Sequence, residues 1–279
     1  MNRSIHWALL TTVLLSLPAT APAQEAPELF VRFELGSRIS YGLLEGDVVR
    51  PIRGDLFGDH ELLPERIPLA SVRLLAPVQP SKVIAVGLNY QSHLGEREPA
   101  PYPGLFAKYP TSLVGPDEPI VRPGDSENLH YEGEMVIVIG KEAKNVTVEE
   151  AADYVFGVTA GNDVSERDWQ SEDLQWFRAK ASDTFGPVGP VIARGLDHND
   201  LLLQTRVNGE TRQSERTRDL LFDVETIVSY VSRYVTLEPG DIIFSGTPGS
   251  TQALQPGDVV EVELEGVGVL RNPVIAGGS

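Results

Sequence analysis

The chain has 279 residues, which is enough for one large domain or for a large domain with a small additional one. Its formal net charge of −17 argues against nucleic acid or an anionic membrane surface as a partner, although a small anionic substrate remains compatible with a cleft that holds a cation. The absence of cysteine excludes disulfides, zinc–thiolate sites and cysteine nucleophiles, so any metal should have oxygen ligands.

The N-terminus has the pattern of a secretory signal peptide. Arg3 supplies a basic start, residues 8–17 are apolar, and Ala21-Pro22-Ala23 fits the small-x-small cleavage pattern. We therefore expect residues 1–23 to be removed after Ala23, which would leave an exported protein that is periplasmic or secreted and makes no contact with the membrane. An uncleaved membrane anchor is the alternative, although the apolar run is short for a transmembrane helix.

The remainder divides at a pair of prolines, Pro77 and Pro80, into two strand-rich parts. Residues 28–76 predict a small N-terminal β domain, and residues 80–275 predict a larger domain dominated by strands. Two short helices interrupt it, one opened by the capping box Thr147-x-x-Glu150 and one capped by Asp223. The expected fold class is therefore α+β and β-rich, with strands at residues 29–33, 39–44, 48–52, 82–87, 130–140, 241–245, 259–264 and 268–270.

Two carboxylates stand at the start of the apolar strand predicted at residues 130–140. Glu132 and Glu134 are two residues apart, so their side chains project from the same face of the strand. Such a pair is most commonly solvated, but at the mouth of a buried strand the two charges repel unless a cation lies between them. Asp163 is the candidate for a third acid, and the three would suit a hard divalent ion.

A second candidate group follows the strand predicted at residues 82–87. His93 and Glu96 are three residues apart and would be neighbours on one helical turn. A carboxylate that orients an imidazole raises its basicity, which is how a water molecule is activated at neutral pH. The alternative is a surface loop in which both residues are solvated.

Polar residues with the chemistry to bind an oxo acid follow Asp163. Arg167 and Gln170 would share a helical face if residues 165–172 are helical, although Ser165 could simply cap such a helix. Lys180, in a predicted loop, would supply positive charge to an enolate unless it is exposed to solvent. Thr247 lies between two glycines in a tight turn, where its hydroxyl and the backbone N–H groups could hold an anion.

Taken in order along the chain, these motifs resemble the fumarylacetoacetate hydrolase family. The resemblance covers residues 80–275, and the small β domain before them matches an N-terminal extension found in the family. It rests on Gly-x-Asn-Tyr-x-x-His at 87–93, Glu-Gly-Glu at 132–134, Asn-Asp-Val-Ser-x-Arg-Asp-x-Gln at 162–170, Lys-x-x-Asp-Thr-Phe-x-Pro-x-Gly-Pro at 180–190, Val-Asn-Gly-Glu at 207–210 and Gly-Thr-Pro at 246–248. The sequence departs from the family pattern at His130, at Ser182 and in the loop after Pro248, which concerns the substrate pocket more than the metal.

The resemblance implies a mixed β-roll core and a homodimer. It also implies a Mg²⁺ or Mn²⁺ ion held by Glu132, Glu134 and Asp163, and a water-activating dyad of His93 and Glu96. Contacts to the oxo and carboxylate groups of the substrate, or to the groups around the metal, are implied for a further set of residues: Arg167, Gln170, Lys180 and Thr247.

The sequence therefore predicts a metal-dependent hydrolase that cleaves a C–C bond in an acylpyruvate-like diketo acid, a small anionic 2-oxo acid, by attack of water activated by His93 and Glu96. One alternative is a hydratase, isomerase or decarboxylase of 2-oxo dicarboxylic acids that uses the same metal and Lys180 without attack of water on carbon. The other is a non-catalytic exported protein that binds dicarboxylates.

Overall fold

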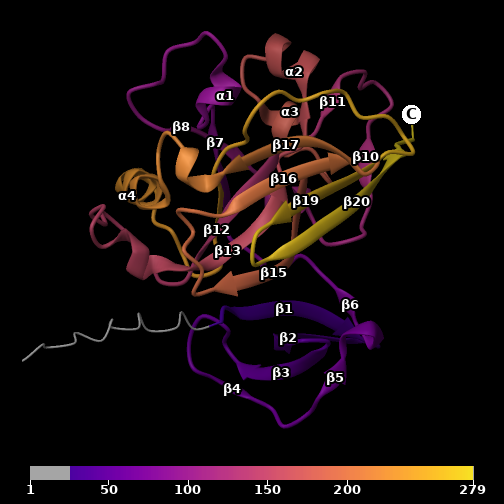
Figure 1. The fold of residues 1–279 in the computed structure, drawn as a ribbon, viewed down its shortest axis with the longest axis vertical. Helices are drawn as coiled ribbons and strands as arrows, with labels where there is room; N and C mark the ends of the chain where they lie inside the picture. Colours follow the sequence, from indigo (N-terminus) through magenta and orange to yellow (C-terminus); the bar gives the residue numbers. More distant parts are fainter. Residues whose placement is uncertain (1–25, 279) are drawn as a thin grey trace, which may run out of the picture.

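The computed structural model describes residues 26–278, so the predicted signal peptide at 1–23 lies outside the described residues. The strand-rich α+β class predicted from sequence is confirmed: two large sheets and one two-stranded sheet are joined by a few short helices (Figure 1). No helix in the described part of the chain is both long enough and apolar enough to cross a membrane.

The larger sheet has thirteen strands, with a main path in the order β4-β3-β2-β1-β15-β13-β12-β18-β7-β8. Its strands are β1 (Glu28–Leu35), β2 (Arg38–Glu45), β3 (Val48–Gly54), β4 (His60–Leu62), β5 (Ile67–Pro68), β6 (Arg73–Leu74), β7 (Val83–Gly87), β8 (Gly104–Lys108), β9 (Leu113–Val114), β12 (Gly133–Ile139), β13 (Val155–Asn162), β15 (Gly186–Arg194) and β18 (Ile242–Phe244).

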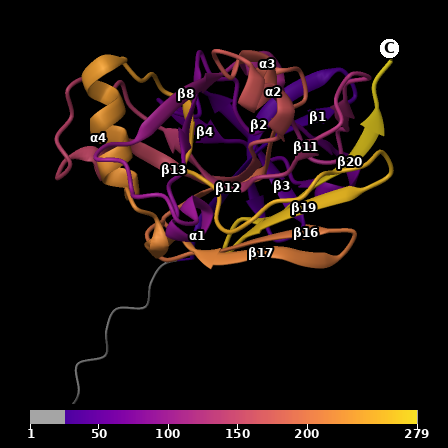
Figure 2. The same cartoon turned by 90° about the horizontal axis from the view of Figure 1, so that it is seen from above.

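The second sheet has five strands in the order β10-β20-β19-β16-β17 and lies along one side of the molecule, opposite helices α2 and α3 (Figure 2). Its strands are β10 (Ile120–Arg122), β16 (Leu202–Val207), β17 (Glu210–Arg216), β19 (Val259–Leu264) and β20 (Gly268–Ala276). The two-stranded sheet joins β11 (Leu129–His130) and β14 (Ser165–Glu166). The α-helices are α1 (Gln91–Leu94), α2 (Arg167–Glu172), α3 (Phe177–Ala181) and α4 (Val224–Tyr234), and the 3₁₀ helices are Leu69–Ser71, Pro110–Ser112, Ala151–Tyr154 and Thr217–Asp219.

The strand that carries the two predicted acids is at the centre of the molecule. Every residue of β12 is buried, as its apolar side chains on both faces require. It pairs antiparallel with β13 on one side and with β18 on the other. Both ends of the strand are thereby fixed, which places its first residues at a defined position in the core.

The N-terminal strands extend the large sheet. The expected strands at 29–33, 39–44 and 48–52 form as β1, β2 and β3, and β1 pairs antiparallel with β15 through Glu28, Leu29 and Phe30. In Figure 1 these strands form the lower part of the molecule, beneath the strands that hold the site.

Both predicted helix starts are followed by a helix. The Asp223 carboxylate accepts a hydrogen bond from the N–H of Thr226 at 2.9 Å and caps α4, whose apolar face is buried. At the other, the Thr147 hydroxyl binds the Glu150 carboxylate at 2.9 Å, and the short helix that ends at Tyr154 is a 3₁₀ helix, Ala151–Tyr154.

Close packing between the two large sheets depends on a glycine between the acids. A Cβ placed on Gly133 would lie 1.9 Å from the Oγ1 atom of Thr205 on β16, which is far inside van der Waals contact. The hydroxyl of Thr205 is buried and has no hydrogen-bond partner among the described residues. Gly133 thus allows the strand of acids to lie directly against the second sheet.

We predict that Gly133→Ala lowers the free energy of unfolding by about 1–3 kcal/mol, the usual cost of overpacking. Urea unfolding measures this, and Thr205→Ala in the same chain should recover part of the loss because it removes the atom nearest to the new methyl group. Wild-type stability in the single Gly133→Ala variant would contradict this account of the packing.

Candidate active site

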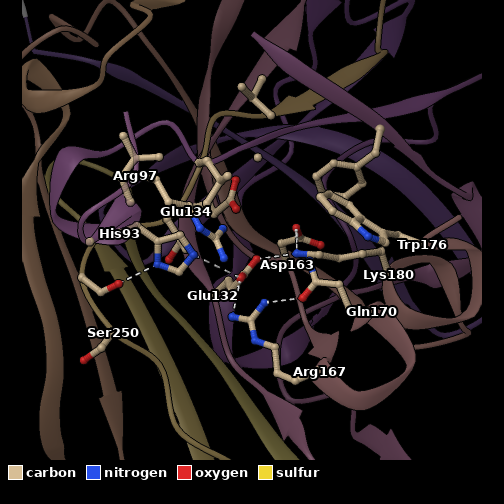
Figure 3. A pocket seen from close by; sticks show the side chains of 18 of the residues that line it. His93, Arg97, Glu132, Glu134, Asp163, Arg167, Gln170, Trp176, Lys180 and Ser250 are labelled. Carbon is tan, nitrogen blue, oxygen red and sulfur yellow. Dashed lines mark hydrogen bonds and ion pairs between the residues drawn. The ribbon is translucent and has the colours of Figure 1, made fainter. Parts of the chain in front are cut away.

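A cavity of about 650 Å³ opens beside the first residues of β12 (Figure 3). All but one of the residues predicted to act line it: His93, Glu132, Glu134, Asp163, Arg167, Gln170, Lys180 and Thr247. They come from five separate stretches of the chain. The exception is Glu96, which is exposed and is not part of the lining.

The three predicted acids converge at the floor of this cavity. Glu132 and Glu134 flank the first residue of β12, and Asp163 follows the last residue of β13. Because Gly133 pairs with Asn162 across the two strands, the acids are brought together at one end of the pair. One carboxylate oxygen from each lies within 4.8 Å of the others, and all three side chains are buried.

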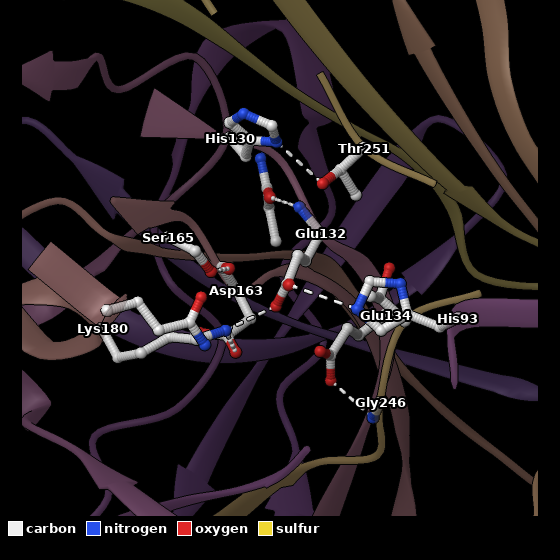
Figure 4. A network of polar contacts seen from close by, with 12 residues as sticks. His93, His130, Glu132, Glu134, Asp163, Ser165, Lys180, Gly246 and Thr251 are labelled. Carbon is white, nitrogen blue, oxygen red and sulfur yellow. Dashed lines mark hydrogen bonds and ion pairs between the residues drawn. The ribbon is translucent and has the colours of Figure 1, made fainter. Parts of the chain in front are cut away.

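Two lysines share the charge of these acids unequally, and Figure 4 shows one of them, Lys180, beside Glu132 and Asp163. Lys180 Nζ lies 2.5 Å from Glu132 Oε2 and 2.7 Å from Asp163 Oδ2. The buried Lys108 binds Asp163 Oδ1 at 2.6 Å and also binds the carbonyl of Lys180. Glu134 contacts neither lysine and accepts one hydrogen bond, at 2.7 Å from the backbone N–H of Gly246.

The pKa values of the acids follow from this division. Burial opposes ionisation of Glu132, but the charges of Lys180 and Arg167 outweigh it and lower the pKa. Burial raises the pKa of Glu134 well above its usual range, and the charges of Asp163 and Glu132 raise it further. Burial also opposes the charge of Lys180, yet Asp163 and Glu132 raise its pKa, so it stays an ammonium ion.

The donor set fits a hard divalent ion. All three groups are carboxylates, which are the ligands that Mg²⁺ and Mn²⁺ prefer in proteins. The raised pKa of Glu134 marks a carboxylate that lacks a cationic partner, and a dication bound to the three oxygens would supply one. Glu132, Glu134 and Asp163 are therefore the residues that could hold such an ion.

His93 is oriented toward the acids, but not by Glu96. Its Nδ1 atom lies 2.6 Å from the carbonyl oxygen of Gly249, which can only accept, so Nδ1 carries the proton. Its other ring nitrogen, Nε2, faces the acids and lies 3.8 Å from Glu132 Oε1. The expected helical pairing with Glu96 was wrong, because α1 ends at Leu94 and Gly95 turns the chain away with a φ of 63°.

Arg167 and Gln170 share a face of α2, as predicted. Arg167 donates to Gln170 Oε1 at 2.8 Å and to Glu132 Oε1 at 2.6 Å. The cap of this helix is the buried Glu166, which accepts from the N–H of Trp169 at 2.7 Å, so the alternative that Ser165 caps it is excluded.

Lys180 also differs from its predicted loop environment. It lies in the last turn of α3 and its side chain is buried, so the alternative of a solvent-exposed lysine is excluded. Burial of a lysine is tolerated here because two carboxylates accept from its ammonium group.

His130, one of the departures from the family pattern, supports the arginine. Its two ring nitrogens lie 2.8 Å from Thr251 Oγ1 and 2.7 Å from Asn128 Oδ1. Burial and the charge of Arg167 lower the pKa of His130 to about 4, so the ring is neutral at physiological pH. Thr251 in turn accepts from Arg167 at 2.9 Å, which ties His130 to the position of the guanidinium group.

Thr247 is held within the protein by a residue that the sequence analysis missed. Its hydroxyl donates to the carbonyl of Gly133 at 2.9 Å and accepts from the Gln213 amide at 2.7 Å. Gln213 also donates to the Pro248 carbonyl at 2.6 Å and accepts from the N–H of Gly133 at 3.1 Å. Because its one proton is already used, this hydroxyl can accept but not donate a further hydrogen bond, contrary to the expectation that it holds an anion.

The missed residues carry no local signal. Lys108 ends a five-residue strand without any neighbouring acid, and Gln213 stands in a strand that otherwise alternates charged and polar residues. The one feature that could have indicated a role for Gln213 is its position: it is the only buried residue of β17, and a buried polar side chain needs hydrogen-bond partners.

We predict that Glu134→Gln stabilises the metal-free protein, and increasingly so as pH rises. A carboxyl whose pKa is raised on folding favours the folded state below its unfolded pKa near 4.5, and that contribution is lost as pH rises through the folded pKa. Glutamine does not titrate, so its melting temperature in excess chelator should exceed that of the wild type by about 2 °C or more at pH 8, and by less at pH 5.

In the same melting series, added Mg²⁺ or Mn²⁺ should stabilise the wild type and have little effect on the glutamine variant. A variant that is destabilised at pH 8, or that responds to metal as the wild type does, would contradict the assignment of Glu134.

We also predict that Gln213 and Thr247 act as a unit. Gln213→Met preserves the shape of the side chain but removes all three hydrogen bonds, and Thr247→Val removes the hydroxyl that receives one of them. Their effects on the free energy of urea unfolding should be non-additive by about 0.5–1 kcal/mol or more in a double-mutant cycle. Strictly additive effects would show that the two side chains are independent.

Solved structures similar to this chain include an isomerase and a hydrolase. A crystal structure of 5-carboxymethyl-2-hydroxymuconate delta-isomerase from Mycobacterium smegmatis is 43% identical, with a TM-score of 0.85, and the match covers 89% of this chain and 100% of that one. The maleylpyruvate hydrolase of Sphingobium sp. SYK-6, in complex with Mn²⁺ and pyruvate, is 31% identical, with a TM-score of 0.75, covering 90% of this chain and 100% of that one. A divalent metal in a relative of this fold agrees with the buried triad of acids.

A curated relative overturns the expected location. The mitochondrial oxaloacetate tautomerase Fahd2a of Rattus norvegicus is 41% identical over 224 residues, which is 75% of this chain and 71% of that protein. This sequence identity to a mitochondrial enzyme contradicts the prediction that the protein is periplasmic or secreted. The prediction rested on the pattern at residues 1–23 alone, and those residues lie outside the described part of the chain.

Two family models together match nearly the whole described chain. The Rv2993c-like N-terminal model matches residues 29–77, and the fumarylacetoacetate (FAA) hydrolase C-terminal model matches residues 82–275, which include every residue of the acidic triad and of its cationic surroundings. On this match, and on the identity to the relatives above, the chain belongs to the fumarylacetoacetate hydrolase family.

Proposed function

We propose that the protein is a divalent-metal-dependent enzyme that moves a proton at the carbon next to the oxo group of a 2-oxo dicarboxylic acid, in a keto–enol tautomerisation or isomerisation. The observation that carries this proposal is the orientation of His93, whose Nε2 faces the acidic triad 3.8 Å from Glu132 Oε1 while the Gly249 carbonyl binds Nδ1. The names of the rat tautomerase and the M. smegmatis isomerase support proton transfer as the reaction.

Glu132, Glu134 and Asp163 would hold the metal, and Mg²⁺ and Mn²⁺ both suit three carboxylates. When bound, the ion would polarise the oxo group and offset the negative charge of the enolate. The Mn²⁺ found in the Sphingobium hydrolase supports manganese, and magnesium remains equally compatible with the ligands.

The chain's own residues would bind and orient the substrate. The Gln170 amide nitrogen has no partner among the described residues, because Arg167 uses only the amide oxygen, so it can donate to a substrate carboxylate. Lys180 places a positive charge beside the acids, where an enolate oxygen would be stabilised. His93 Nε2 takes the proton from carbon and returns it elsewhere on the substrate, while the Gly249 carbonyl keeps the ring in place.

Hydrolysis of a C–C bond is the second candidate, favoured by the likeness to maleylpyruvate hydrolase. His93 would then take a proton from water instead of from carbon. Because Glu96 is exposed and lies outside the lining of the cavity, the water-activating dyad expected from the sequence is not assembled in this structure. Proton transfer needs only His93 and is therefore the proposal we favour. Assembly as a homodimer stays a prediction.

The test follows the decay of enol-oxaloacetate by its ultraviolet absorbance, with Mn²⁺ or Mg²⁺ present. His93→Gln keeps the size and polarity of the side chain but removes the base, so we expect the enzymatic rate to fall by about 10²–10⁴-fold. Glu96→Gln should keep a rate close to that of the wild type.

Acetylpyruvate, assayed in parallel for release of acetate and pyruvate, separates the two candidates. Cleavage that is lost in both His93→Gln and Glu96→Gln would favour the hydrolase and overturn the proposed tautomerase, as would an enol-oxaloacetate rate that is unchanged by His93→Gln.

A further inference from the structure

One cation in the lining of the cavity has no acid to bind. Arg167 and Lys180 both lie within 4 Å of a carboxylate of the triad. Arg97 also lines the cavity, but it forms no ion pair and no side-chain hydrogen bond with any described residue. In a protein of net charge −17, most described arginines do pair with a carboxylate, so a free one beside the active site is unusual.

The backbone holds Arg97 close to the catalytic base. Helix α1 carries His93 and ends at Leu94, and the N–H of Arg97 returns to the carbonyl of Leu94 at 3.3 Å. The turn that contains Arg97 is thereby fastened to the helix that contains His93. Figure 3 shows the two residues on the same side of the cavity, with Lys180 and Trp176 on the other.

The cavity has room for a substrate that extends beyond the acidic triad. Its volume is about 650 Å³, and its lining includes both the acidic triad and Arg97. On the side of Trp176 the wall is formed by the rings of Phe106 and Trp176, which pack edge to face with their centroids 5.4 Å apart. The only cation on that side of the described lining is Lys180, which is already bound to Glu132 and Asp163. The guanidinium group of Arg97 on the opposite side can match a carboxylate with two parallel hydrogen bonds.

We propose that Arg97 binds the far carboxylate of the substrate and so selects 2-oxo acids that carry a second carboxylate over those of equal length that lack one. The inference rests on the proposed function, which places the first carboxylate and the oxo group at the acidic triad. It assigns to Arg97 the choice of substrate and leaves the proton transfer to His93.

A pair of stable ligands matched in length tests this inference by binding alone. 2-Oxoglutarate and 2-oxovalerate have the same number of carbons and the same 2-oxo acid head, but only the first has a second carboxylate. Calorimetry on the Mn²⁺-loaded full-length protein should show tighter binding of 2-oxoglutarate. Arg97→Gln should weaken the binding of 2-oxoglutarate about tenfold or more and leave the binding of 2-oxovalerate unchanged, because a charge-assisted hydrogen bond is lost for 2-oxoglutarate only.

Two further variants sharpen the result. Arg97→Lys keeps the charge without the bidentate geometry and should lie between the wild type and the glutamine variant. Arg38→Gln removes the same charge from an exposed position on β2, where the arginine contacts only Ser40, and should leave the binding of both ligands unchanged.

Equal affinity of the wild type for the two ligands, or an equal loss of both in Arg97→Gln, would overturn the role of Arg97 while leaving the proposed function in place. Failure of the Mn²⁺-loaded wild type to bind either 2-oxo acid would contradict the proposed function itself, and with it the inference that depends on it.

Discussion

The repulsion among three buried carboxylates is the constraint on which the rest of this site depends. Glu132, Glu134 and Asp163 have carboxylate oxygens within 4.8 Å of one another and are buried at the floor of the cavity. Lys180 neutralises the first and the third of them, and Glu134 receives only one backbone hydrogen bond. Ionisation of buried Glu134 costs the most free energy, because this carboxylate has no cationic partner. A bound dication would offset that cost.

The scaffold fixes this arrangement from two directions. The antiparallel pair β12 and β13 sets the spacing of the acids, and the loop at residues 246–251 closes over them. The backbone of that loop donates to Glu134 and accepts from His93, and its Thr251 accepts from Arg167. The part of this loop after Pro248 is one of the places where the sequence departs from the family pattern. That departure affects the orientation of His93 and Arg167, while the metal ligands themselves are preserved.

What could be predicted from sequence is what depends on local periodicity. The apolar strand with two acids at its start, and Arg167 three residues before Gln170, have the arrangement that strand and helix geometry dictate. The predicted pairing of Glu96 with His93 was wrong because it assumed a continuous helical turn, whereas the helix ends at Leu94 and Gly95 redirects the chain. Lys108 and Gln213 could not be found, since they reach their partners across 55 and 80 residues of chain, and such contacts exist only once the sheets have assembled.

The most direct test of the account is to locate the metal. Crystals grown with Mn²⁺ and a 2-oxo acid should give an anomalous difference peak between the carboxylates of Glu132, Glu134 and Asp163, with the acid beside it in the cavity. A peak at another position, or none at this one in protein that binds Mn²⁺ in solution, would contradict the central claim that these three acids form the metal centre of the enzyme.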